Sequence, residues 1–354
     1  MRDICAKLSD LFENNACSVL ATIITQSGPS PRGAGTKCII MEDGSLAGSI
    51  GGGILEAYVL ERALQVFETG LPLSVHFSLQ GSDVADSEML CGGEVEVFLE
   101  PVSPGDLSHL SIFQEVTKIQ NRGGAGILAT VVDPNRWYTG QVPKMFLEKG
   151  GSGIGSLLGL EELEASLSAR MDHFLKEGSP VIIQLPDETG DEVRVFVEPV
   201  VSSPVLYIFG AGHVSRQIVP LAARVGFQTV VTDDRPEFAD AGYFPEAVEV
   251  LRMPFNGVMD RLPVDESSFL VIVTRGHMHD KDVLAQALKT RAKYIGMIGS
   301  TRKRKIIYEK LREQGFTEED LSRVHSPIGV EIGAETPAEI AVSIVAELIS
   351  VRAG

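Results

Sequence analysis

The chain has 354 residues, 44% of them hydrophobic and 22% charged, which is typical of a globular protein large enough for two or three domains. Its 48 acidic residues outnumber its 31 basic residues, and the resulting net charge of −17 at pH 7 would repel a nucleic-acid backbone. Because the sequence shows no apolar run as long as a membrane span and its N-terminus is too polar for a signal peptide, we expect a cytoplasmic protein that binds neither nucleic acid nor membrane.

The first hundred residues predict an α/β unit. Residues 3–14 and 54–67 have the apolar spacing of amphipathic helices. Four apolar segments predict strands, at 17–25, 36–41, 73–77 and 94–99. Three loops separate these elements: a Gly/Pro/Ser-rich loop at 26–35, a triple glycine at Gly51-Gly52-Gly53, and a polar loop at 80–91.

The next hundred residues repeat this plan. Three pairs of segments echo each other: Ser18–Ile24 and Gly126–Val132, Gly48-Ser49 and Gly155-Ser156, and Glu94–Val102 and Asp191–Val200. We therefore predict a duplicated α/β unit, with copy one at 17–102 and copy two at 124–200, packed as one N-terminal domain over residues 1–200. A chance similarity of two strand–helix–strand units is the alternative interpretation.

The two copies differ in two places. The triple glycine Gly51-Gly52-Gly53 stands where copy two has Leu157-Leu158-Gly159. The polar loop at 80–91 is replaced in copy two by a tight turn at 187–190. Glycines let a backbone approach a ligand closely, and loops on a rigid frame often carry sites. These differences favour a functional site in copy one.

Cys91 ends the loop that copy two lacks, and Gly92 and Gly93 follow it. A thiol in this setting would be accessible to a metal or to a sulfur-bearing cofactor, whereas the plainer interpretation is a small residue at the start of a strand. The other cysteines lie in helix or strand patterns and are expected to pack in or near the core: Cys5, Cys17 and Cys38. Four scattered cysteines indicate reduced thiols rather than a disulfide scaffold.

After a linker at 201–204, residues 205–354 predict a Rossmann-like domain with a parallel sheet. A strand leads into Gly210-Ala-Gly212-His213, then a helix, then a second strand that ends at Asp233-Asp234. In such a unit the glycines admit a pyrophosphate at the helix N-terminus, and an acidic residue binds a ribose hydroxyl. NAD(P) or another nucleotide is therefore a candidate ligand, with a bare scaffold as the alternative. Ser215 departs from the usual third glycine or alanine.

Two further loops of this domain carry polar side chains. Four residues that can bind a divalent metal or transfer protons follow the strand at 269–274: His277, His279, Asp280 and Asp282. One of the aspartates could instead cap the helix predicted at 283–290. The basic run at 302–305 follows a glycine turn and could bind a phosphate or form a solvated face.

The chain resembles the xanthine dehydrogenase accessory proteins of the XdhC/CoxI family over nearly its whole length. In the N-terminal part the resemblance rests on three segments: Ser27–Gly35, Gly51–Glu56 and Cys91–Gly93. In the C-terminal part it rests on five: Phe209–Val214, Asp233–Arg235, Tyr294–Ser300, His325–Gly329 and Gly333–Glu339. Together these motifs are specific to the family, although no single one is.

The resemblance implies a maturation factor rather than a metabolic enzyme. Members of the family bind the molybdenum cofactor, protect its sulfurated form and deliver it to a molybdenum hydroxylase of the xanthine dehydrogenase or carbon monoxide dehydrogenase type. They are usually homodimers, and a cysteine desulfurase is a further expected partner. Under this interpretation Cys91 contacts the cofactor, and Gly51–Gly53, Gly92, Gly93 and the turn at Arg32 shape its pocket.

The resemblance also changes the interpretation of the glycine turn. Gly210, Gly212 and His213, with Asp233 and Asp234, would hold the phosphate or nucleotide end of that cofactor rather than NAD. Two alternatives remain. An NAD(P)-dependent oxidoreductase would use the same turn, but the sequence shows no catalytic constellation beside it. A metal-dependent hydrolase or nucleotidyltransferase would use His277, His279, Asp280 and Asp282.

Overall fold

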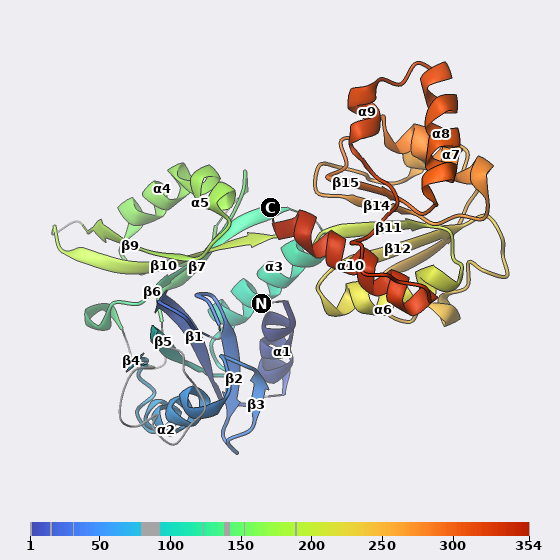
Figure 1. Ribbon diagram of the computed structural model, residues 1–354. Helices are drawn as coiled ribbons and strands as arrows, with labels where there is room; N and C mark the ends of the chain where they lie inside the picture. The colour runs from blue at the N-terminus through green and yellow to red at the C-terminus, as the bar shows by residue number, and fades with distance from the viewer. Residues whose placement is uncertain are drawn as a thin grey trace. The chain divides into compact units, whose positions relative to one another are not determined.

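The computed structural model divides into two compact units, Met1–Ser202 and Ser203–Gly354 (Figure 1). It describes every residue except 1, 15, 31, 79–92, 123, 138–141, 152, 188–189 and 354, and the side chains at 2, 3, 13, 122, 277 and 278 are also outside the description. Cys91 and Gly92 therefore lie outside the described residues. Among the helices that are described, none has the length and apolar character needed to cross a membrane.

The first unit begins with a five-stranded antiparallel sheet. Its strands, in sheet order, are β3 (Leu46–Gly48), β2 (Lys37–Met41), β1 (Ser18–Ser27), β5 (Glu94–Val102) and β4 (Leu73–Ser78). Helix α2 (Gly53–Thr69) buries Leu55, Val59, Ala63 and Val66, at helical spacing, in a core with the inner side chains of this sheet. Gly70, at φ +65°, ends the helix in a left-handed cap.

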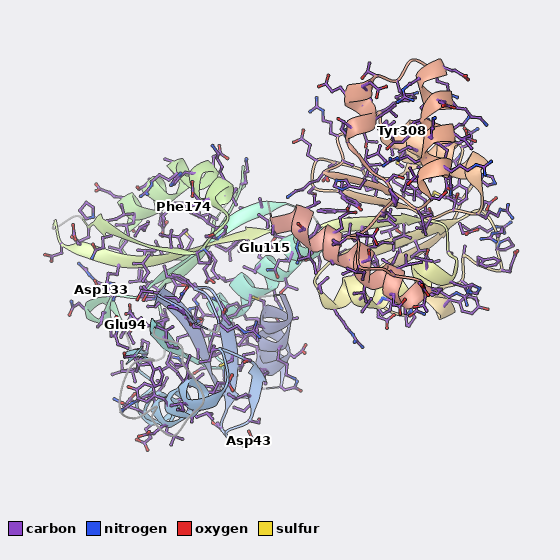
Figure 2. The ribbon with its side chains drawn as sticks, viewed as in Figure 1. Asp43, Glu94, Glu115, Asp133, Phe174 and Tyr308 are labelled. Carbon is purple, nitrogen blue, oxygen red and sulfur yellow. The ribbon has the colours of Figure 1, made fainter. Side chains whose placement is uncertain are left out.

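A second sheet of the same unit has the same strand order. Its strands are β8 (Gly153–Ser156), β7 (Lys144–Glu148), β6 (Ala125–Val131), β10 (Glu192–Val201) and β9 (Val181–Pro186), all antiparallel. Helices α4 (Glu161–Ala169) and α5 (Met171–Glu177) occupy the place of α2, with Phe174 of α5 in the core that they form with the sheet (Figure 2). A short 3-10 turn, η2 (Pro134–Arg136), follows β6.

The two sheets of the first unit share buried contacts. Helices α1 (Arg2–Glu13) and α3 (Leu107–Arg122) contribute to one core that also contains side chains from both sheets. A second, smaller shared core contains equivalent residues of the two copies: Ile24 with Val132, and Phe98 with Phe196. The duplicated segments therefore form a pseudo-symmetric pair that buries its common face.

The second unit is a parallel six-stranded sheet with helices on both faces. In sheet order the strands are β13 (Glu249–Arg252), β12 (Gln228–Asp233), β11 (Val205–Phe209), β14 (Phe269–Ile272), β15 (Tyr294–Met297) and β16 (Val324–His325). Helices α6 (His213–Arg224) and α10 (Pro337–Ala353) cover one face (Figure 1). The 3-10 turn η3 (Ala241–Tyr243) lies on the same face as α6, with the Arg216 guanidinium over the Tyr243 ring. Helices α7 (His277–Ala287) and α8 (Thr301–Glu313) cover the other face, with α9 (Glu318–Ser322) and the 3-10 turn η4 (Met259–Arg261).

The predicted fold class is confirmed: antiparallel α/β sheets in the first unit and a Rossmann-like parallel sheet in the second. One predicted boundary is wrong. The sequence predicts a loop over 275–282 before a helix at 283–290, but α7 begins at His277. Gly276, at φ +82°, turns the chain into the helix, and the polar first turns lack the apolar spacing that identifies a helix in sequence.

Candidate functional site

The glycine turn of the second unit follows β11, at the point where the connections of two neighbouring strands leave in opposite directions along the sheet. Strand β11 connects through α6 to β12 on one side, whereas β14, its other neighbour, connects through α7 to β15 on the opposite side. Ligand clefts of open α/β sheets form at such switch points. Position 210 requires glycine, because its φ is +109° and a Cβ would lie 2.5 Å from the Val273 carbonyl oxygen. The glycine turn after β11 and the segment after β14 are thus in close backbone contact.

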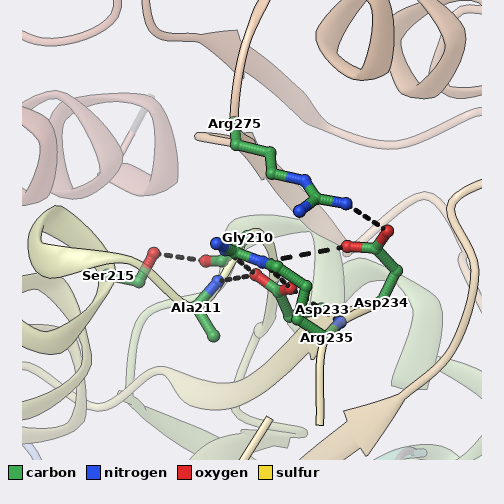
Figure 3. A network of polar contacts seen from close by, with 7 residues as sticks. All are labelled: Gly210, Ala211, Ser215, Asp233, Asp234, Arg235 and Arg275. Carbon is green, nitrogen blue, oxygen red and sulfur yellow. Dashed lines mark hydrogen bonds and ion pairs between the residues drawn. The ribbon is translucent and has the colours of Figure 1, made fainter. Parts of the chain in front are cut away.

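Both carboxylate oxygens of Asp233, the expected ribose ligand, already accept hydrogen bonds from protein groups (Figure 3). Oδ2 accepts a hydrogen bond from the Ala211 N–H at 2.8 Å, and the Arg235 guanidinium donates to both oxygens at 2.9 Å. Burial opposes ionisation of Asp233, but these hydrogen bonds outweigh it and hold its pKa below the ordinary value. Asp233 therefore fastens the end of β12 to the glycine turn.

Asp234 is the more accessible of the two acids. Its Oδ2 lies 2.9 Å from a guanidinium nitrogen of Arg275, and the side chains of Asp234 and Arg275 are 25% and 50% exposed (Figure 3). The other oxygen, Oδ1, is buried and has no hydrogen-bond partner among the described residues. The structure thus brings the ends of β12 and β14 together through this ion pair.

The start of α6 is open. Gly212 is the N-cap, no side chain caps the helix, and its first turn contains no acidic residue. A Cβ added at Gly212 would meet no described atom within 4 Å. The Ser215 hydroxyl points inward and donates to the Gly210 carbonyl, whereas His213 is exposed. The N–H groups of the first turn are consequently placed to receive an anion.

The predicted metal ligands are placed differently from one another. Asp280 is fully buried, accepts hydrogen bonds from the Thr274 N–H at 3.1 Å and hydroxyl at 2.6 Å, and forms an ion pair with Lys303. His279 packs against the Phe255 ring, with centroids 5.5 Å apart. Within the described part of the chain, no three His, Cys, Asp or Glu side chains are grouped as for a metal ion. The side chain of His277 is outside the description.

The basic run divides between two roles. Lys303 pairs with Asp280, and Arg304 donates to the Ser326 carbonyl. Arg302 and Lys305 are exposed at the start of α8, where the Ser300 hydroxyl already caps the helix. The run therefore contributes two internal contacts and two solvent-facing charges.

In the first unit the triple glycine adopts a conformation that favours glycine. Gly51, Gly52 and Gly53 have φ of +132°, +75° and +60°. Glu56, which the sequence alone does not single out as a site residue, orders this turn. Its Oε1 accepts from the Ser49 hydroxyl at 2.7 Å and from the Ile50 and Gly52 N–H groups at 3.2 and 3.0 Å.

Copy two has the same arrangement around Glu164. Its Oε1 accepts from the Leu157 N–H at 2.9 Å, and the Ser156 hydroxyl accepts from the Leu158 N–H at 3.0 Å. Leu158 takes φ +54°, a conformation uncommon outside glycine. The shared Ser and Glu, visible in sequence as part of the repeat, are the signal that could have identified Glu56.

Gly93 lies directly against the loop that carries Arg32. A Cβ at Gly93 would be 2.4 Å from the Pro29 carbonyl oxygen and 2.6 Å from that of Ser27. Glu94 pairs with Ser27 across β5 and β1, and Arg32 is exposed (Figure 2 labels Glu94). Because neighbouring strands are antiparallel, the ends of β1 and β3 and the starts of β2 and β5 share one edge of the sheet. The structure thus brings Arg32, Gly51–Gly53 and Gly93 to that edge.

Family comparisons match both units. Residues 11–78 match the model of the XdhC and CoxI family, and residues 206–348 match the XdhC Rossmann domain. The chain belongs to the XdhC and CoxI family.

Three relatives and one solved structure extend the similarity. A Bacillus subtilis (strain 168) protein described as a probable subunit of xanthine dehydrogenase is 26% identical over 349 residues, 98% of this chain and 96% of that protein. The molybdenum cofactor insertion chaperone PaoD of Escherichia coli (strain K12) is 21% identical over 335 residues, 95% of this chain and 83% of PaoD. An uncharacterized protein of the same organism, YqeB, is 29% identical over 256 residues, which are 69% of this chain and 46% of YqeB, so the alignment spans about half of that relative.

A solved crystal structure has a similar fold over nearly the whole chain. A protein from Bacillus halodurans, described as a xanthine dehydrogenase, superposes with a TM-score of 0.78 at 27% identity and covers 99% of this chain and 95% of that one. The XdhC Rossmann domain of the present chain has the glycine turn, but its acidic residue, Asp233, is hydrogen-bonded to Arg235 of the same chain. Binding of a cofactor by the predicted site residues stays a prediction.

Proposed function

We propose that this chain is an accessory protein that binds the molybdenum cofactor and delivers it to a molybdenum hydroxylase of the xanthine dehydrogenase type. The observation that carries the proposal is the similarity to a molybdenum cofactor insertion chaperone over 95% of the chain. That similarity spans both units rather than the Rossmann domain alone, so a shared nucleotide fold does not explain it.

The first unit has features that fit a sulfur-bearing pterin cofactor. A Cβ at Gly52 would meet no described atom within 4 Å, so the triple-glycine turn presents bare backbone to a ligand. Gly93, packed against the loop of Arg32, lies at the same sheet edge, and Cys91 and Gly92 directly precede it in sequence. We propose that Cys91 contacts the cofactor, because a thiolate is a soft ligand, while Gly51–Gly53, Gly92 and Arg32 shape the pocket.

The second unit, considered by itself, fits an anionic group. The uncapped start of α6 offers N–H groups, and no acidic side chain of its first turn opposes a phosphate. We propose that Gly212 and His213 bind the phosphate or nucleotide end of a cofactor, with Gly210, Asp233 and Asp234 ordering the turn. An NAD(P) oxidoreductase is the weaker candidate, since the carboxylate that would hold a ribose is bound to Arg235.

The partners follow from this role. An apo molybdenum hydroxylase receives the cofactor, and that cofactor, when bound, supplies the molybdenum chemistry of the acceptor enzyme. A cysteine desulfurase as the sulfur source and a homodimer as the working form are further parts of the proposal.

The proposal is tested by titrating the purified full-length protein with molybdopterin. We expect saturable one-to-one binding that Cys91→Ala weakens by about tenfold or more, equivalent to about 1.4 kcal/mol. Cys17→Ala is the matched control, because Cys17 is a free, exposed cysteine of the same unit. Equal binding by Cys91→Ala and the control would remove Cys91 from the site, and absence of binding by the unmodified protein would contradict the proposed function.

A further inference from the structure

The first unit contains a pocket, between the start of α3 and copy two, that none of the predicted site residues lines. Its volume is about 260 Å³, and it is formed by the first turn of α3, the start of β7 and the connection from β8 to α4. This volume is just below the roughly 300–1,000 Å³ of typical ligand pockets. The pocket is therefore large enough for one small ring system and too small for a whole dinucleotide.

Two hydrogen-bond acceptors meet at this pocket. The His109 Nε2 lies 2.9 Å from the Val142 carbonyl oxygen, which can only accept, so Nε2 carries the proton of a neutral ring. Nδ1 is then an acceptor, and it lies 3.2 Å from Oδ2 of Asp106, a second acceptor. Nδ1 is buried and makes no hydrogen bond to any described residue. A donor is missing between these two atoms.

Protonation of His109 would supply such a donor, but its surroundings oppose it. Burial, and then the charge of Lys144, lower the pKa of His109, although Glu100 and Asp106 act in the opposite direction. Lys144 itself donates to Glu100 at 2.6 Å, and both side chains are 2% exposed. The neutral imidazole is therefore the form to expect, and the acceptor pair calls for a donor from outside the protein.

The rim of the pocket adds two features. Ser108, exposed on the first turn of α3, offers a hydroxyl beside the acceptor pair. Leu158, with its positive φ of +54° and 39% exposure, lines the pocket. Its N–H donates to Ser156 as that of Gly51 donates to Ser49, so Leu158 corresponds to Gly51, one residue from the alignment predicted from the sequence. A left-handed leucine is uncommon, and such conformations concentrate at functional sites.

We propose that this pocket binds the 2-amino-4-oxopyrimidine edge of a pterin ring. The ring's 2-amino group and N3–H would donate to Asp106 Oδ2 and His109 Nδ1, the 4-oxo group would accept from Ser108, and Leu158 would cover the ring. This inference rests on the proposed function, in which the ligand is a pterin cofactor. Guanine presents the same edge, so the recognition chemistry is shared by the two ring systems.

The inference is tested by fluorescence titration of the full-length protein with free pterin, and with lumazine, in which an oxo group replaces the 2-amino group. We expect pterin to bind about tenfold or more tightly than lumazine. Asp106→Asn should reverse this preference, because the amide can donate to the 2-oxo group. Asn is as good an N-cap as Asp, so the variant keeps the start of α3, which circular dichroism would verify.

Asp172→Asn is the matched control, since Asp172 is an 83% exposed aspartate of the same unit, and it should bind as the unmodified protein does. Equal binding of pterin and lumazine, or an unchanged preference in Asp106→Asn, would overturn the inference. Tighter binding of guanosine than of pterin would assign the pocket to a purine and overturn it as well.

Titration with whole molybdopterin separates the two proposals. If the unmodified protein and Asp106→Asn bind it equally, the pocket inference fails alone, whereas no binding by either refutes the proposed function.

Discussion

Lys37 of copy one lies 2.5 Å from Glu198 of copy two, and both side chains are almost fully buried. The equivalent residues with the copies exchanged, Lys144 and Glu100, form a second buried pair at 2.6 Å. A third contact joins two equivalent positions, Glu96 and Arg194, through hydrogen bonds of 2.8 and 3.1 Å. The ion pairs therefore follow the pseudo-symmetry of the duplicated unit and connect its two halves.

We expect Lys37→Met to destabilise the first unit by about 3–5 kcal/mol, because the variant leaves the Glu198 carboxylate buried without its cation. The double variant with Glu198→Leu should recover much of this loss, since it removes both charges. Arg291→Met, which breaks an exposed ion pair of the second unit, should leave stability nearly unchanged. Denaturant unfolding measures these differences. A single variant as stable as the unmodified protein would contradict a structural role for the buried pair.

Glu56 and Glu164 form a matched pair of variants. Replacing either by Ala should destabilise the first unit by about 1–3 kcal/mol, because backbone N–H groups lose their acceptor. Both variants should also weaken molybdopterin binding: Glu56→Ala disorders the triple-glycine turn of copy one, and Glu164→Ala disorders the turn of Leu158 that lines the proposed pterin pocket. Thermal unfolding and ligand titration of both variants measure the two effects. Undiminished molybdopterin binding in Glu56→Ala would place the cofactor site away from the triple-glycine turn.

Asp233 should make the second unit sensitive to acid. Its pKa is lower in the folded protein than in the unfolded chain, so its contribution to stability is present above the unfolded pKa of about 3.9 and is lost as the pH falls through the folded value. Asp233→Asn should thus be less stable than the unmodified protein near neutral pH, and the difference should shrink below about pH 4. Urea unfolding across this range checks it. A difference that is constant with pH would contradict the ion pair with Arg235.

Gly212 allows a test of anion binding at α6. Its φ of −80° suits any residue and a Cβ has room there, so Gly212→Ala and Gly212→Asp should both fold normally. The carboxylate of Gly212→Asp should weaken binding of pyrophosphate by about tenfold or more through charge repulsion, whereas Gly212→Ala should retain it. Calorimetric titration measures both. Equal affinities would exclude the start of α6 as the anion site.

The sequence predicts the fold class because its signals are local. The strand Val205–Phe209 and the glycine turn each lie within a few residues, and the repeat shows in two short segments of similar sequence, Ser18–Ile24 and Gly126–Val132. The start of α7 is not predicted because residues 277–282 are polar and lack helical periodicity.

The contacts that connect distant residues could not be predicted in the same way. Lys37 and Glu198 are 161 positions apart, and only the packing of the two copies brings them together. Arg235 is two residues from Asp233 in sequence, but its guanidinium could have faced solvent. The pairing depends on how β12 ends beside the turn after β11. The pocket of Asp106 and His109 likewise arises where α3, β7 and β8 meet.

Transfer of the molybdenum cofactor to an acceptor enzyme is the step that defines the proposed role. The most direct measurement adds the cofactor-loaded protein to an apo molybdenum hydroxylase of the xanthine dehydrogenase type and follows the appearance of hydroxylase activity. We expect faster and more complete activation than an equal amount of free cofactor gives, with a matching loss of cofactor from the donor. Activation no better than that by free cofactor, with the cofactor retained on the donor, would contradict it.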